Sequence, residues 1–185
     1  MKKVIVALAL MLGVSLSTFA QDYSVKKGYK GFVEGGYTCF IGISGYSQDV
    51  AEYSAGKIDW TTTHGYQINP YLFVGAGVSL DCYTRYTKFA MPIFADVRVT
   101  PLKGNITPYI DVKGGYTGIG WFKGLYFVPT IGCRFGLTNR TGLYVGLGYS
   151  LQQTNTKMYE WDPLDKIEDE YINFNAFTFK VGFDF

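Results

Sequence analysis

The segment that most constrains the fold of this chain runs from residue 171 to residue 185 and reads YINFNAFTFKVGFDF. Successive side chains of a β-strand point to opposite faces, so residues of one parity share a face. From residue 176 onward, one parity carries only large apolar side chains, and the other carries small, polar or charged ones. The apolar set is Phe177, Phe179, Val181, Phe183 and Phe185, and the opposing set is Ala176, Thr178, Lys180, Gly182 and Asp184. The segment therefore predicts a strand whose apolar face contacts either lipid or a protein core.

Seven earlier segments also have the composition of strands. They span residues 30–43, 57–68, 71–83, 89–100, 107–118, 125–137 and 142–153. Short connections at 69–70, 103–105 and 138–140 alternate with longer, more polar ones at 44–56, 84–88, 119–124 and 154–170. An even number of strands joined in this way is typical of transmembrane barrels. We predict an all-β fold, an eight-stranded antiparallel up-and-down transmembrane β-barrel.

The two parities indicate which face meets lipid. Glycine fills the polar parity of several strands, where the narrow interior of eight strands needs small residues. The same interior is too narrow for the many phenylalanines, leucines and valines of the other parity. Charged residues make up only 17% of the chain, against about 25% in ordinary soluble domains. These observations favour lipid outside over the alternative, a secreted lipocalin-like carrier. The alternation is weakest at 57–68, where Ile58, Trp60, Thr62, His64, Tyr66 and Ile68 would face lipid.

The beginning of the chain has the pattern of a secretory signal peptide. Lys2 and Lys3 precede an apolar run at 4–14, and small residues lead to Ala20. We predict cleavage of residues 1–20, which leaves residues 21–185 as one outer-membrane β-barrel domain. Removal of the signal leaves 15 basic and 15 acidic residues. A formally neutral chain gives no support to nucleic-acid binding, so we expect no nucleic-acid partner.

Glycine–aromatic pairs recur along the strands, at 35–37, 114–116 and 148–149. With the alternating strands and Phe185, they make the mature chain resemble small outer-membrane β-barrel proteins of the OmpA/OmpX type. The segment 64–77, HGYQINPYLFVGAG, is similar to the version common in Bacteroidota. The resemblance implies a monomer in the cell outer membrane, in contact with outer-membrane lipid and lipopolysaccharide. It also implies that the barrel-assembly machinery reads Phe179, Val181, Phe183 and Phe185 during insertion. Such barrels serve as anchors, adhesins, narrow pores or lipid-modifying enzymes, so the resemblance does not select an activity.

Charged residues on the inward parity form the first candidate site. Because an unpaired charge in a narrow lumen is costly, we expect acids and bases to pair and close it. The alternative is a narrow, porin-like channel for ions or small solutes, gated by exchanging ion pairs. The residues are Glu34, Asp81, Asp96, Arg98, Asp111, Lys113, Arg134, Lys180 and Asp184.

Enzymatic chemistry receives little support. The single histidine, His64, is expected on the lipid-facing parity near the turn end of its strand, without a serine beside it. Cys39, Cys82 and Cys133 are odd in number and match no zinc spacing, and the glycines at 75 and 77 lack the rest of a dinucleotide motif. We expect no catalytic, cofactor-binding or metal-binding residues.

The connection at 154–170 is the second candidate site, because aromatic and acidic residues gather there. Such a loop could bind a divalent cation or an extracellular partner, or could simply be a solvated polar loop. Its candidate residues are Tyr159, Glu160, Trp161, Asp162, Asp165, Glu168, Asp169 and Glu170. The sequence thus predicts a non-enzymatic envelope or surface-recognition protein that acts through extracellular loops.

Overall fold

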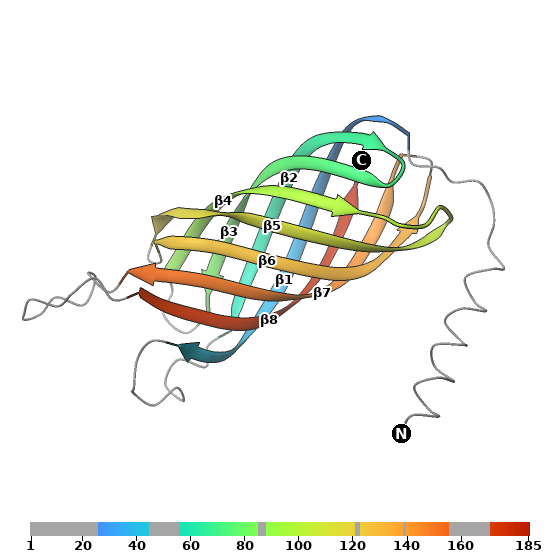
Figure 1. Cartoon of the computed structure of the whole chain (residues 1–185). Coiled ribbons are helices and arrows are strands. Elements are labelled where there is room, and N and C mark those ends of the chain that lie inside the picture. The colour runs from blue at the N-terminus through green and yellow to red at the C-terminus, as the bar shows by residue number, and fades with distance from the viewer. Residues whose placement is uncertain (1–25, 45–55, 85–87, 121–122, 139, 156–170) are drawn as a thin grey trace, which may run out of the picture.

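The strands close into a single barrel. A computed structural model describes residues 26–44, 56–84, 88–120, 123–138, 140–155 and 171–185. Within these ranges the order of elements is β1 (Gly28–Ser44), β2 (Lys57–Asn69), β3 (Leu72–Tyr83), β4 (Lys88–Val99), β5 (Ile106–Gly120), β6 (Gly124–Gly136), β7 (Gly142–Asn155) and β8 (Tyr171–Asp184). Each strand pairs antiparallel with the next, and the sheet is a closed barrel (Figure 1). The predicted all-β fold is confirmed, and every predicted strand boundary lies within about two residues of the observed one.

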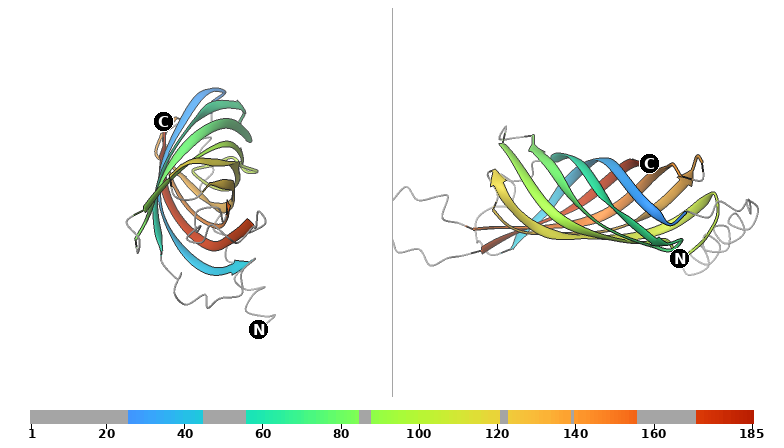
Figure 2. Two further views of the ribbon diagram at one scale, coloured as in Figure 1. Left: turned by 90° about the vertical axis from the view of Figure 1, so that its left-hand side faces the viewer. Right: turned by 90° about the horizontal axis from the view of Figure 1, so that it is seen from above.

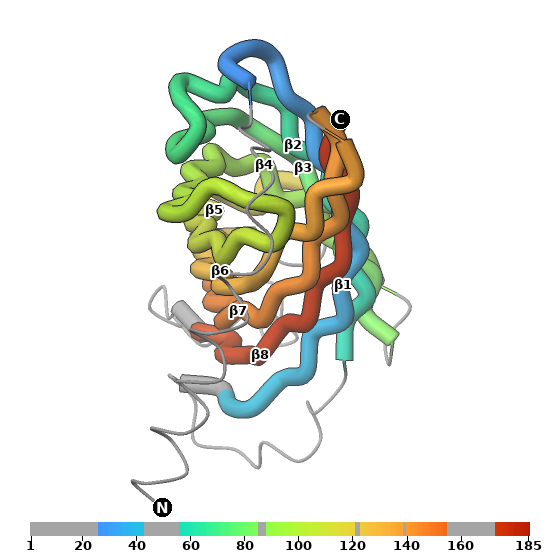
Figure 3. The backbone as a smooth tube through the Cα atoms, turned by 90° about the vertical axis from the view of Figure 1, so that its right-hand side faces the viewer, coloured from blue at the N-terminus to red at the C-terminus, as the bar shows by residue number. Residues whose placement is uncertain are grey.

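Closure depends on the first and last strands of the barrel. β1 pairs with β8 from Phe32↔Asp184 to Ser44↔Asn173, with a bulge between Phe40 and Gly42. The two strands run side by side in the tube view (Figure 3). All strands are tilted relative to the long axis of the barrel, as closure of eight strands requires (Figure 2). The connections that follow β2, β4 and β6 lie at one end of the barrel, here called the turn end, and those that follow β1, β3, β5 and β7 lie at the other, the loop end. The expected alternation of length holds only in part, because the connections at 84–87 and 121–123 are shorter than those at 100–105 and 137–141.

The outer surface of the barrel is apolar on all sides. Among the described residues, 34 large hydrophobic side chains are exposed, whereas 11 hydrophobic residues are buried. The predicted outward parity is confirmed in β8, where Phe177, Phe179 and Val181 are exposed. It is also confirmed in β2, the strand with the weakest pattern, where Ile58 and Trp60 are exposed. The alternation of each strand therefore sorts its side chains into an apolar wall and a polar lumen.

The residues that face the lumen include large aromatic side chains as well as small and polar ones, so the sequence prediction was incomplete. Phe32, Phe73, Tyr109 and Tyr144 form a buried aromatic cluster toward the turn end. Inward glycines make room for these rings: a Cβ added at Gly75 would lie 2.6 Å from Cζ of Phe73. Real Cβ atoms do not approach other atoms so closely, so glycine here is a packing requirement. The small residues and the rings fit together to fill the interior.

Three prolines, Pro92, Pro108 and Pro129, lie inside strands, where proline is unusual because it has no N–H to donate, and two of them coincide with gaps in the strand pairing. The recorded β3–β4 pairing stops at Val78↔Ile93 and resumes at Asp81↔Ala90, on either side of Pro92. The β6–β7 pairing stops at Phe127↔Leu151 and resumes at Thr130↔Gly148, on either side of Pro129. Pro92 and Pro129 therefore each coincide with a local interruption of the strand pairing.

Several predictions concern parts of the chain outside the described residues. These are the signal peptide at 1–20 and the candidate loop residues Tyr159, Glu160, Trp161, Asp162, Asp165, Glu168, Asp169 and Glu170. Over the ranges that the structure does describe, no helix is long and apolar enough to cross a membrane.

Candidate functional site

The barrel interior holds twelve buried charged side chains, six basic and six acidic, among the described residues. All nine residues predicted to face inward are buried there: Glu34, Asp81, Asp96, Arg98, Asp111, Lys113, Arg134, Lys180 and Asp184. The sequence analysis missed Lys30, Lys57 and Asp59, which are also buried. Each has the inward parity of its strand, so strict extension of the alternation in β1 and β2 would have found them. With them included, the lumen carries no formal net charge.

The centre of the lumen is a cluster of two cations and three carboxylates from β1, β4 and β5. The guanidinium Nη2 of Arg98 donates to Glu34 Oε1 at 2.6 Å and to Asp111 Oδ2 at 2.7 Å. Nζ of Lys113 lies 2.9 Å from Glu34 Oε2 and also donates to Asp111. Arg98 and Glu34 are 64 positions apart in the chain, so closure of the barrel brings them together. Charged groups removed from water in this way need such partners.

Asp96 belongs to the same cluster but is held differently. One carboxylate oxygen lies 3.9 Å from both Arg98 Nη2 and Lys113 Nζ. Neither oxygen has a hydrogen-bond partner among the described residues, and the residue is completely buried. Asp96 therefore gains only charge attraction from its neighbours. Both cations of the cluster lie within 4 Å of three different carboxylates.

Two further groups of charges flank the centre. Toward the turn end, Asp184 Oδ2 lies 2.5 Å from Lys30 Nζ and accepts from Arg134 Nη2 at 3.2 Å. Toward the loop end, Lys57 Nζ donates to Asp81 Oδ2 at 2.6 Å, and Ser79 donates to the other oxygen of Asp81 at 2.5 Å. Ion pairs thus occupy the lumen at both ends as well as in the middle.

Lys180 and Asp59 form a looser pair. Their charged atoms lie 3.7 Å apart, and Lys180 Nζ has no hydrogen-bond partner among the described residues. Thr38 donates its hydroxyl to Asp59 at 3.2 Å. Asp59 is therefore fixed by both a hydroxyl and a cation.

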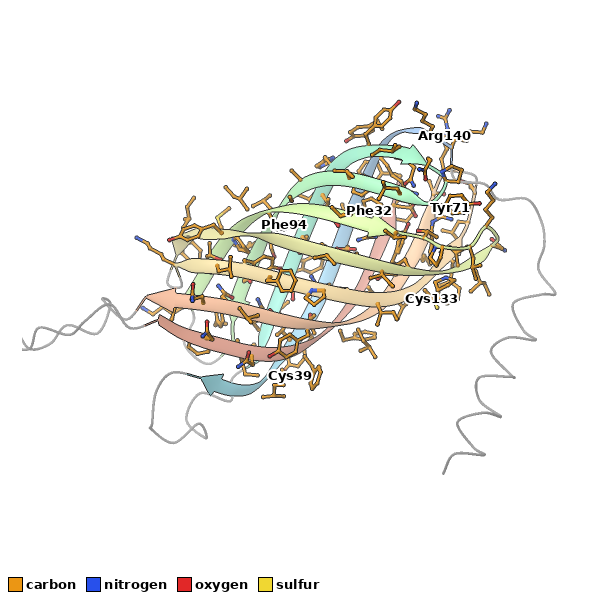
Figure 4. The ribbon with its side chains drawn as sticks, in the orientation of Figure 1. Phe32, Cys39, Tyr71, Phe94, Cys133 and Arg140 are labelled. Atoms are coloured by element: carbon orange, nitrogen blue, oxygen red, sulfur yellow. The ribbon has the colours of Figure 1, made fainter. Side chains whose placement is uncertain are left out.

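Aromatic rings cover the charged groups along the axis. The guanidinium carbon of Arg98 lies 4.1 Å from the ring centre of Phe32, 4.8 Å from that of Tyr144 and 4.9 Å from that of Tyr109. A cation over an aromatic face is stabilised most when water is excluded. Phe32 and Phe94 carry labels in Figure 4, which shows the side chains on the ribbon. The inward charges lie close to opposite charges, and these rings are an addition that the alternation alone did not specify.

The remaining candidates lie outside the lumen. Tyr29 Oη is 2.6 Å from Nδ1 of His64, and Thr62 Oγ1 is 3.0 Å from its Nε2, so hydroxyls occupy both ring nitrogens. His64 and its two hydroxyl partners all face outward. The cysteines are free and exposed on the outer wall, as their parity predicted, and Cys39 and Cys133 are labelled in Figure 4. No group of three or more potential metal ligands occurs in the ranges that could be searched.

Comparisons with known proteins identify a fold but no family. No protein-family model matches the sequence, and no curated protein matches it. The crystal structure of the outer membrane protein OprG from Pseudomonas aeruginosa is similar, with a TM-score of 0.50 and 11% sequence identity over 89% of this chain and 99% of that one. Neisserial surface protein A, NspA, has a TM-score of 0.44 and 13% identity over 83% of this chain and 96% of that one. A designed transmembrane β-barrel has a TM-score of 0.43 and 13% identity over 83% and 94%. The OprG likeness supports the eight-stranded antiparallel barrel.

Proposed function

We propose that this chain is an integral outer-membrane β-barrel protein that acts without catalysis in the cell envelope, through its extracellular loops. The observation that carries the proposal is that large hydrophobic side chains lie on the outside of the barrel and charged side chains inside, the reverse of a water-soluble protein. The 34 exposed large hydrophobic residues surround a lumen that holds twelve buried charges. Soluble monomers rarely expose contiguous apolar patches of more than a few hundred square ångströms. Hydrocarbon, not water, is the solvent that such a wall fits.

The structural similarity to OprG, an outer membrane protein, supports this placement. A lipocalin-like carrier would instead need its apolar parity inside, and these strands point that parity outward. We further infer that the protein is a monomer of the OmpA/OmpX type that contacts lipopolysaccharide. In this proposal, Phe179, Val181, Phe183 and Phe185 are the residues read by the barrel-assembly machinery.

Fractionation of cell envelopes tests the membrane placement. The protein should be found in the outer-membrane fraction, and an unheated sample should migrate differently from a boiled one on a gel that preserves folded barrels. Recovery in the soluble fraction, without a mobility change on heating, would reject the proposal.

The loop function is tested separately. Deletion of residues 159–169, with the barrel still inserted and heat-modifiable, should abolish binding of an extracellular partner or weaken the membrane against detergent. Unchanged surface binding and unchanged envelope integrity would show that the acidic loop is only a solvated connection.

A narrow conduction pathway is the second candidate function. It is favoured by one observation: Arg98 and Lys113 each lie within 4 Å of the same three carboxylates, so they could exchange partners without leaving a charge unpaired. If such exchange opens the lumen, the combined replacement of Arg98 and Arg134 by alanine should raise conductance in a planar bilayer. No rise in conductance would exclude the channel and leave the closed barrel.

A further inference from the structure

The outer wall contains an apolar hollow that neither the lumen nor the loops explain. It has a volume of about 640 Å³ and extends over β5, β6, β7, β8 and β1. Its walls include Ile131, Leu147, Phe177 and Phe179, all of them outward-facing and exposed. Pockets that take small molecules have volumes of about 300–1,000 Å³, so this one is large enough for part of a ligand.

The floor of the hollow lies where the sheet is interrupted. Pro129 and Tyr149 both line it, and the β6–β7 pairing between these two residues is missing, next to the pair Thr130↔Gly148. Thr130 and Thr178 also line the hollow, and their hydroxyl groups have no hydrogen-bond partner among the described residues. The depression therefore coincides with a break in the β6–β7 ladder at Pro129.

A cluster of amide side chains adjoins the hollow on its loop-end side. Asn173 and Gln153 are cross-strand neighbours with the outward parity of β8 and β7, and Gln153 Nε2 donates to Asn173 Oδ1 at 3.4 Å. Asn175, also on the outward parity of β8, accepts from the hydroxyl of Tyr149 at 2.6 Å. Tyr149 itself lines the hollow. The amide cluster and the hollow thus form one continuous surface with a polar end and an apolar end.

We propose that this surface binds one membrane lipid, with an acyl chain in the hollow and its polar linkage region at the amide cluster. Asn175 and Phe179 are four positions apart in β8, which corresponds to a distance of about 13 Å along the strand. An amphiphile has the same order of polar and apolar parts, and carboxamides can hydrogen-bond to ester, amide or hydroxyl groups. The amides lie toward the loop end, so the lipid belongs to the leaflet on that side. The inference rests on the proposed membrane placement.

Native mass spectrometry of the folded protein, released from detergent and titrated with dioleoyl phosphatidylcholine, tests the site. The parent protein should retain one lipid. Ile131→Trp should lose the bound lipid, because its indole ring would occupy the space proposed for the acyl chain. Ile93→Trp is the matched control, because both isoleucines are 63% exposed but Ile93 does not line the hollow. The control should bind lipid as the parent does.

The outcomes are distinguishable from failure of the membrane proposal. Each variant is first checked for heat-dependent gel mobility, which reports barrel folding regardless of the site, and Leu147→Trp replaces Ile131→Trp if the latter does not fold. Equal lipid retention in parent, filled variant and control would overturn the site, since only ordinary lipid contact would remain. The site would also be overturned if the parent protein formed a dimer without lipid and the Ile131→Trp variant did not. A second copy of the chain would then occupy the hollow.

Discussion

Lysine at position 93 would test whether hydrocarbon surrounds the barrel. Ile93 is 63% exposed and lies in β4, five residues from Lys88 and six from Val99. With a rise of about 3.3 Å per residue and a tilt near 40°, those separations correspond to about 13–15 Å of depth from each end of the strand. Ile93 is therefore near the middle of the apolar band.

The expected cost of Ile93→Lys is about 2–4 kcal/mol of unfolding free energy, the range for lysine at the bilayer midplane. In water the same exposed substitution would change stability by no more than about 0.5 kcal/mol. Leu102→Lys is the control, because Leu102 is 46% exposed in the turn after β4, where a charge should cost only about 0–1 kcal/mol.

Equilibrium unfolding by denaturant in phospholipid vesicles, followed by tryptophan fluorescence, measures both variants; the chain contains 3 tryptophans. The reasoning is refuted if Ile93→Lys is as stable as the parent, or if the two lysine variants lose the same free energy.

Three further substitutions examine the interior and the seam. Arg98→Ala should cost about 3–5 kcal/mol in the same unfolding assay, because Lys113 alone would then balance the buried carboxylates of Glu34, Asp96 and Asp111; adding Glu34→Ala should recover part of that loss, and strict additivity would argue against coupling. Gly75→Leu should reduce the yield of heat-modifiable barrel, since its Cβ alone would lie 2.6 Å from Phe73. A leucine introduced at an outward-facing position should leave that yield unchanged. Gly31→Leu should lower the temperature of the gel-mobility transition by displacing the ring of Phe185, whose Cζ would lie 2.6 Å from the new Cβ, and an unchanged transition would show that the ring has no role at the seam.

The amino-acid sequence specified the barrel well because one rule, the alternation of faces, acts at nearly every strand residue. It placed Phe177 and Phe179 outside and Lys180 and Asp184 inside, and the structure agrees. In β2 the outward residues are less apolar, so the alternation of faces is less clear. The inward residues Lys57 and Asp59 were therefore not predicted.

The alternation does not predict which inward residues touch. Arg98 pairs with Glu34, and Tyr83 with Gln152, only because closure of the barrel fixes how far each strand is shifted against its neighbours. Nor does the alternation show that the inward rings of Phe32 and Phe73 meet, because they come from different strands. Their fit depends on glycines such as Gly65, which the register of β2 against β3 places opposite Gly75 and next to the ring of Phe73.

The β1–β8 seam also sets an order of events in biogenesis. β1 and β8 are the barrel strands farthest apart in the chain, yet they form one continuous ladder. Until β8 is in place, β1 keeps a free edge with unpaired backbone groups, which attracts other strands. Addition of β8 is therefore the earliest moment at which the cylinder can close. A truncated chain that lacks β8 would remain an open sheet with two exposed edges.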